Sequence, residues 1–150
     1  PTSPEGVRHG CPDFRPQHPL SACDTRVQPV AAGVLIFAGA LVMRNASGFI
    51  TKGAIATGAV AVGRAESKVD NSGGAAGAAM VEYRQGVFAF ENAGADPVTQ
   101  AGVGNLCFVL DDQTVAATDG AGTRSRAGIV DGLDGGRVWV RLDEAITRGA

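Results

Sequence analysis

Closely spaced acidic residues are the first group in this chain that could do chemistry. The apolar run at 106–110 (LCFVL) ends on Asp111 and Asp112, within the segment VLDDQTVAATDG. Adjacent carboxylates serve as acid–base pairs, as metal ligands or as turn formers. A calcium loop needs oxygen ligands at alternate positions over about a dozen residues and a closing glutamate, and this spacing is missing here. Because the Asp-Gly pattern recurs at Asp119-Gly120, Asp131-Gly132 and Asp134-Gly135, we interpret these acids as turn residues.

Four potential zinc ligands lie near the N-terminus, namely His9, Cys11, His18 and Cys23. Structural zinc sites usually pair their ligands about two to four residues apart. Here one, six and four residues intervene, and three of the intervening residues are prolines. We therefore expect an extended segment without a metal, and no Cys11–Cys23 disulfide in a reducing compartment.

Catalytic machinery is not evident elsewhere in the chain. A nucleophilic Cys–His pair needs a rigid scaffold, and both histidines lie in the proline-rich N-terminal segment. Gly102-Val103-Gly104 follows no expected strand and lacks the third glycine of a nucleotide-binding loop. The sequence therefore predicts no catalytic, metal or cofactor residues and a protein that is not an enzyme.

The segment 137–142 (RVWVRL) alternates strictly between two kinds of side chain. Period-two alternation in a strand places Val138, Val140 and Leu142 on one face and Arg137, Trp139 and Arg141 on the other. Trp139 either caps the edge of the core under the arginine stems or anchors an interface, since Trp and Arg are enriched at binding hot spots.

The elements that would position these residues are short strands. Apolar runs occur at 34–38, 41–43, 49–51, 59–62, 80–84, 87–90, 106–110, 113–116, 127–130 and 138–142, and nearly every gap contains Gly, Asp or Asn. This pattern predicts an all-β fold, a compact jelly-roll-like sandwich or barrel of about eight to ten short strands. A short helix is expected to begin with Asp96 as N-cap and Pro97 as its first residue, and to end by Gly104.

The prolines divide the chain. Six of the seven lie in the first 29 residues, where they exclude a helix or a central strand. We expect an extended N-terminal arm at 1–28, a β-rich core domain at 29–142 and a C-terminal tail without clear structure at 143–150.

Composition narrows the possible partners. The 150 residues suffice for one domain, and the net charge of -2 gives no electrostatic reason to expect nucleic acid or a membrane as partner. The opening residues lack the pattern of a secretory signal, and no apolar run approaches the roughly 18 residues of a membrane span. We expect the protein to fold in a reducing cytoplasm.

From about Val30 to Val140 the chain resembles the head cement, or decoration, proteins of tailed bacteriophages. The likeness is carried by the order and spacing of short pieces: 30–34 (VAAGV), 37–42 (FAGALV), 61–65 (AVGRA), 69–71 (VDN), 84–88 (RQGVF), 95–99 (ADPVT), 111–115 (DDQTV), 127–130 (AGIV) and 138–140 (VWV). The arm at 1–28 lies outside it.

This resemblance implies a β-rich structural protein, made in the host cytoplasm, that is added to the outer surface of an assembled capsid. Such a protein cements neighbouring subunits of the phage major capsid protein and stabilises the head. Homo-oligomers are implied, trimers as the first expectation and dimers as the second. We expect the capsid or oligomer interface to include Phe14, Arg15, Leu20, Arg137, Trp139 and Arg141.

Two other functions remain open at this point. One is a carbohydrate-binding or host-attachment β domain on the virion, with sugars stacked on Trp139, Tyr83 or Phe14. The other is a small hydrolase that uses Asp111-Asp112 or a Cys–His pair.

Overall fold

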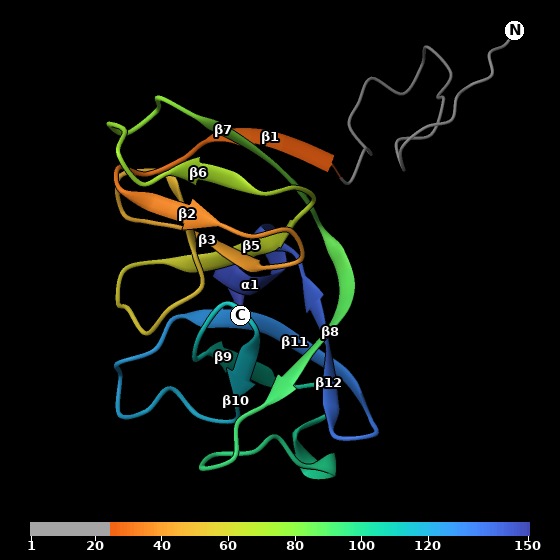
Figure 1. Cartoon of the computed structure of the whole chain (residues 1–150). Coiled ribbons are helices and arrows are strands. Elements are labelled where there is room, and N and C mark those ends of the chain that lie inside the picture. The colour runs from red at the N-terminus through yellow and green to blue at the C-terminus, as the bar shows by residue number, and fades with distance from the viewer. Residues whose placement is uncertain (1–24) are drawn as a thin grey trace, which may run out of the picture.

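The computed structural model describes residues 25–150, and this part of the chain is nearly all β. It contains twelve short strands, a 3-10 turn and one short α-helix (Figure 1). The all-β class and the barrel or sandwich architecture are thus confirmed, with more strands than the eight to ten expected.

Strands β1 to β7 form the N-terminal half: β1 (Thr25–Pro29), β2 (Val34–Ile36), β3 (Leu41–Arg44), β4 (Ile50–Lys52), β5 (Val60–Ala65), β6 (Val69–Asn71) and β7 (Met80–Arg84). The C-terminal half contains β8 (Gly86–Asn92), η2 (Gln100–Gly102), β9 (Leu106–Val109), β10 (Thr114–Ala116), β11 (Arg126–Asp134), β12 (Arg137–Leu142) and α1 (Glu144–Gly149).

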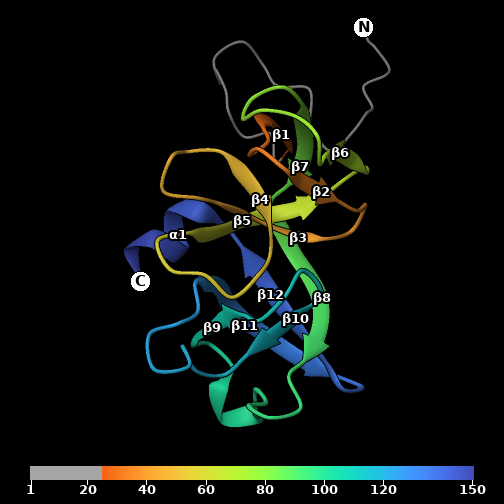
Figure 2. The same cartoon turned by 60° about the vertical axis from the view of Figure 1, so that its left-hand side comes forward.

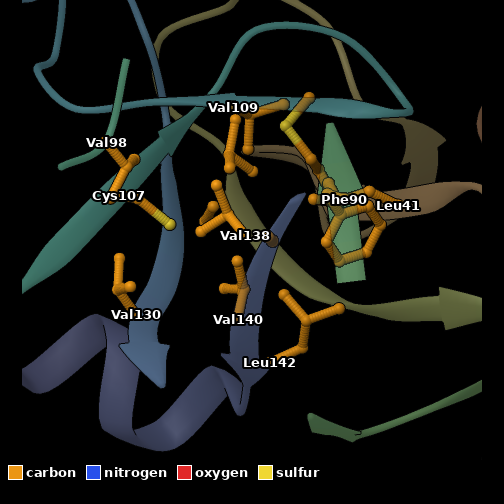
Figure 3. Packing of buried hydrophobic residues seen from close by; sticks show 13 residues of the cluster. Leu41, Phe90, Val98, Cys107, Val109, Val130, Val138, Val140 and Leu142 are labelled. Atoms are coloured by element: carbon orange, nitrogen blue, oxygen red, sulfur yellow. The ribbon is translucent and has the colours of Figure 1, made fainter. Parts of the chain in front are cut away.

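The C-terminal strands close into a small barrel. The hydrogen-bonded order is β11-β12-β8-β10-β9, and β9 pairs again with β11. All pairs are antiparallel except β8–β10, which is parallel. The interior is filled by the inward residues of each strand, among them Phe90, Cys107, Val109, Val138 and Val140 (Figure 3). Full burial of such a side chain contributes about 1.5–3 kcal/mol, so period-two alternation determines which face of each strand turns inward.

The N-terminal strands pack a second core against this barrel. β1, β7, β5, β3 and β4 form a sheet, and the two-stranded β2–β6 sheet covers it (Figure 2). β3 contributes to both cores, because Leu41 and Met43 pack in the barrel whereas Val42 packs in the second core. The two halves are therefore joined by shared strands.

Both ends of the described chain are more ordered than the sequence suggested. Thr25–Pro29 pairs with β7, so the described part of the expected arm belongs to the sheet. The C-terminal segment was expected to be a tail without clear structure, but it contains α1. Asp143 caps this helix, since its Oδ1 accepts hydrogen bonds from the backbone N of Ala145 (3.1 Å) and Ile146 (3.3 Å).

Two local predictions are wrong. Asp96 does not cap a helix; its carboxylate accepts hydrogen bonds from Thr118 and Arg124 instead, and the 3-10 turn begins only at Gln100. Asp131-Gly132 is not a turn, because it lies at a β-bulge inside β11. In contrast, Asp134 does precede a hairpin turn, in which Gly135 and Gly136 have φ of 60° and 86°.

Candidate interaction face

One face of the barrel carries three of the six expected interface residues, Arg137, Trp139 and Arg141. On β12 the burial alternates residue by residue, with Val138, Val140 and Leu142 fully buried. Arg137, Trp139 and Arg141 point the other way, so the predicted alternation is confirmed. We call the surface around them the outer face; it comprises Leu106, Ile129, Asp131, Gly132, Asp134, Arg137, Trp139, Arg141, Val87, Ala89 and Glu91.

Strand register arranges this outer face in three rows. The first row runs Leu106, Ile129, Arg141, Val87 across β9, β11, β12 and β8. The second is Gly132, Trp139, Ala89, and the third is Asp134, Arg137, Glu91. Directly opposite side chains in an antiparallel pair lie about 5 Å apart, so each row is a set of contacting neighbours.

Trp139 is the exposed apolar residue of the outer face. The side chain is 38% exposed, and it belongs to neither hydrophobic core. Its neighbours Leu106, Ile129 and Val87 are only partly buried. A Cβ at Gly132 would meet no atom within 4 Å, so the surface beside Trp139 on β11 is open.

Within the described part of the chain, some charged side chains of the outer face have hydrogen-bond or ion-pair partners and others have none. Arg137 donates to the backbone O of Ala89 at 3.0 Å, and its Nε lies 4.0 Å from Glu91 Oε2. Arg141 and Asp131 are both exposed, and neither has a hydrogen-bond or ion-pair partner within residues 25–150. Asp134 is likewise exposed and has no such partner within residues 25–150, so the outer face presents one unpaired cation and two unpaired anions around an exposed tryptophan.

The remaining residues that the sequence singled out at the N-terminus lie outside the described part of the chain. These are the expected interface residues Phe14, Arg15 and Leu20 and the four potential zinc ligands His9, Cys11, His18 and Cys23.

The acidic pair behaves as a turn. Asp111 Oδ1 accepts a hydrogen bond from Gln113 N at 2.8 Å, and the backbone O of Thr114 accepts from Leu110 N at 3.0 Å. Partial burial raises the pKa of Asp112, and the nearby charge of Asp111 adds to this effect. No cluster of three or more His, Cys, Asp or Glu residues is placed to hold a metal ion within residues 25–150. The turn interpretation of Asp111 and Asp112 is confirmed.

Cys107 lies in the barrel interior. Its side chain has 0% exposure, and burial raises the pKa of the thiol to about 12. A thiolate is the reactive form of cysteine, so this residue acts as a small apolar side chain.

Sequence reasoning missed an ion pair between residues 100 positions apart. Arg44 on β3 donates from Nε to Glu144 Oε2 at 2.9 Å and from NH2 to Oε1 at 3.2 Å. Arg44 also donates to the backbone O of Gly48 and to the hydroxyl of Tyr83. No local signal marks this pair, because its partners meet only when α1 packs on the N-terminal sheet.

The structure also has two open hollows beside α1. One, of about 460 Å³, is lined in part by Arg124, Arg126 and Arg148, and the other, of about 470 Å³, lies next to Glu144. The three guanidiniums already have partners: Arg124 binds Asp96, Arg148 binds Glu144, and Arg126 donates to three carbonyl oxygens at the end of α1. Since these positive charges are matched internally, the hollows do not indicate an anion site.

Comparison with known proteins gives no basis for assigning a function. No family model, no curated protein and no solved structure matches it. Within residues 25–150, no helix has the length and apolar character that crossing a membrane requires.

Proposed function

We propose that this protein is a structural virion component that binds the outer surface of an assembled phage capsid. There it cements neighbouring subunits of the major capsid protein and stabilises the head. The proposal is supported by the resemblance of an ordered series of short sequence pieces to head cement proteins. Two of them lie at structurally important places: 111–115 turns from β9 into β10 and 84–88 connects the two halves of the molecule.

The physical basis of cementing supports this function. One subunit that bridges two capsid proteins adds its own binding free energy to their contact, and the gain repeats at every equivalent site of the shell. A scaffold for this purpose needs a rigid surface more than a pocket. The two cores joined by β3 and β5 provide such a scaffold, and the outer face provides exposed apolar and charged groups.

The contacts with the capsid and with other copies are assigned to two parts of the chain. One part is the outer face with Arg137, Trp139 and Arg141, and the other is the N-terminal segment with Phe14, Arg15 and Leu20. Trp and Arg are typical of binding hot spots because they combine large contact area with directional hydrogen bonds.

Co-sedimentation with phage heads tests the proposal. The full-length protein is mixed with heads of the phage that encodes it, before and after expansion. We expect binding to expanded heads only, and at least about tenfold weaker binding of Trp139→Ala, because a hot-spot residue contributes about 2 kcal/mol or more.

The matched control is Phe37→Ala, which removes another exposed aromatic side chain (49% exposed) away from the outer face. This variant should bind like wild type. A protein that sediments with neither form of the head, or that is absent from purified virions, contradicts the proposed function. A Trp139→Ala variant that melts much earlier but binds normally would show that Trp139 has only a packing role.

Carbohydrate binding is the second candidate, and the exposed side chain of Trp139 on the outer face of the barrel favours it. Sugars stack on such rings, and the neighbouring charges could hydrogen-bond their hydroxyls. A glycan-binding screen that gives a hit with wild type, and loses it with Trp139→Ala, would replace the capsid proposal.

A further inference from the structure

Strand β1 has one edge without a partner strand among residues 25–150. The hydrogen-bonded order of the larger sheet begins at β1, which pairs with β7 and with no other described strand (Figure 1). Such an edge presents backbone N–H and C=O groups that can pair with another strand. Which strand fits depends on the groups that point outward.

Pro29 determines which backbone groups of β1 point away from β7. Proline has no N–H, and the next residue, Val30, donates from its backbone N to Ala79 O at 2.9 Å, so the backbone of Pro29 itself points outward. Because hydrogen-bonded and non-hydrogen-bonded pairs alternate along an antiparallel ladder, the backbone groups of Thr25 and Val27 point outward as well. The edge therefore offers two N–H groups, from Thr25 and Val27, and three C=O groups, from Thr25, Val27 and Pro29.

The missing N–H of Pro29 restricts which strand can pair here. A residue placed opposite Pro29 can donate to its C=O, but the C=O of that opposing residue receives no hydrogen bond in return. An opposing residue whose C=O already accepts a hydrogen bond from its own chain avoids this cost. Thr25 is such a residue, because the guanidinium of Arg26 donates to Thr25 O at 3.3 Å. A second copy of β1 therefore contains the residue that Pro29 requires.

Two β1 strands place these residues opposite each other when they pair antiparallel about Val27. Val27 then lies opposite Val27 of the second copy, and Thr25 of each copy lies opposite Pro29 of the other. This ladder contains four backbone hydrogen bonds, two between the Val27 residues and two from Thr25 N to Pro29 O. It also covers the side chain of Val27, which is 55% exposed within residues 25–150, with its own counterpart.

Other registers between two β1 strands are less favourable. A pair centred on Arg26 sets this residue opposite Arg26 of the second copy, and like charges directly opposite each other destabilise a strand pair. A pair centred on Gln28 sets Pro29 opposite Val27, which leaves only two of the four hydrogen bonds within residues 25–29. With Val27 at the centre, Arg26 lies opposite the uncharged Gln28.

We propose that β1 pairs with β1 of a second copy about a two-fold axis at Val27, so that the N-terminal sheets of two molecules form one continuous sheet. This inference goes beyond the proposed function and does not depend on it, because the pairing involves no capsid protein. The contact is one strand of five residues on each side, so we expect a dissociation constant on the order of 100 µM.

Removal of the outward N–H of Val27 tests the pairing. The full-length protein is examined by sedimentation equilibrium at concentrations on both sides of the expected dissociation constant. Val27→Pro eliminates both hydrogen bonds between the two copies of residue 27, and an edge strand accommodates proline where its N–H points outward. We expect at least about tenfold weaker self-association. Val27→Thr keeps the N–H and the β-branched side chain, so this control should associate within about threefold of wild type.

Cysteine cross-linking tests the register, and it also applies if Val27→Pro does not fold. We expect mild oxidation of Val27→Cys to link residue 27 of two copies, because directly opposite Cα atoms lie about 5.5 Å apart, within the range of a disulfide. Thr25→Cys is the control. Residue 25 of one copy lies about four residues, or roughly 13 Å, from residue 25 of the other, which is too far for a disulfide. Peptide mapping by mass spectrometry identifies the linked positions, and a link between two copies of the same residue is necessarily intermolecular.

Four results would overturn this inference. The protein could be monomeric throughout the concentration range, or a folded Val27→Pro variant could associate as strongly as wild type. Thr25→Cys could form a link between two copies of residue 25 as readily as Val27→Cys does between two copies of residue 27. A Val27 amide protected from hydrogen exchange in a monomer would show that another segment of the same chain covers the edge. Capsid co-sedimentation separates this inference from the proposed function, because dimers that do not bind heads refute cementing alone and monomers that bind heads refute the dimer alone.

Discussion

Replacing Glu144 by Gln removes one charge of the ion pair that joins α1 to β3. Arg44 makes two hydrogen bonds to this carboxylate, at 2.9 and 3.2 Å, and only 21% of each side chain is exposed. Hydrogen bonds to charged groups contribute about 1.5–3 kcal/mol, whereas exposed ion pairs contribute about 0–1 kcal/mol. Because about a fifth of the pair remains exposed, we expect Glu144→Gln to lower the free energy of unfolding by about 2 kcal/mol near pH 7.

The pKa of Glu144 determines how this loss depends on pH. Burial opposes ionisation of the carboxyl, but the hydrogen bonds from Arg44 and Arg148 outweigh it and hold the pKa below its ordinary value. A carboxyl with a lowered pKa in the folded state stabilises the fold fully above its unfolded pKa of about 4.3. This contribution is lost as the pH falls through the folded pKa. The difference between wild type and Glu144→Gln should therefore be constant from about pH 6 to 8 and decrease below about pH 4.

Urea unfolding followed by circular dichroism measures both effects. A loss of about 2 kcal/mol moves the midpoint by roughly 1 M urea for a chain of this size. The matched control is Glu91→Gln, because Glu91 lies 4.0 Å from Arg137 and its side chain is 60% exposed. The control should unfold at the wild-type midpoint. Equal shifts for the two variants, or a Glu144→Gln shift that persists unchanged at about pH 3.5, would refute the reasoning.

The remaining predictions concern the barrel. Gly128→Ala should lower the free energy of unfolding by about 3 kcal/mol, since its Cβ would overlap the backbone O of Arg141 and lie 3.0 Å from Val140 Cγ1. Gly132→Ala, on the same strand but in open space, should change it by less than about 0.5 kcal/mol in the same urea titration, and equal effects would disprove the overlap. Cys107 should stay unmodified by a thiol reagent in the native protein and react in urea, because its thiol is buried and its pKa is raised to about 12. Peptide mapping by mass spectrometry distinguishes Cys107 from the other cysteines. Rapid labelling of Cys107 in the native protein would show that the barrel interior is accessible.

Local sequence patterns predicted those features that depend on a few neighbouring residues. The alternation of 137–142 placed Val138 and Val140 inside and Trp139 outside, because in a strand successive side chains point to opposite faces. The Asp111 turn was also predictable, since a carboxylate that accepts a hydrogen bond from the backbone N two residues on is a local property.

The two wrong local predictions concern sequence patterns that are compatible with more than one backbone conformation. Asp131-Gly132 has the composition of a turn, yet the chain continues across it as a bulge, because β12 pairs on both sides of it. Asp96-Pro97 has the pattern of a helix start. The Asp96 carboxylate instead accepts hydrogen bonds from Thr118 and from Arg124, which is 28 positions away. In both cases a long-range contact decided between two locally acceptable conformations.

The sequence by itself determined the all-β class, the inward and outward faces of β12 and the turn role of Asp111 and Asp112. Only the tertiary structure decided that β9 returns to β11 to close a barrel, that β3 serves two cores and that Arg44 meets Glu144. It also decided that the bulge residue Asp131 lies on the Arg141 side of the Gly132–Trp139 pair. The physical reason is that alternation specifies which side of a strand is apolar, whereas strand partners depend on hydrogen bonds and packing between segments far apart in the chain.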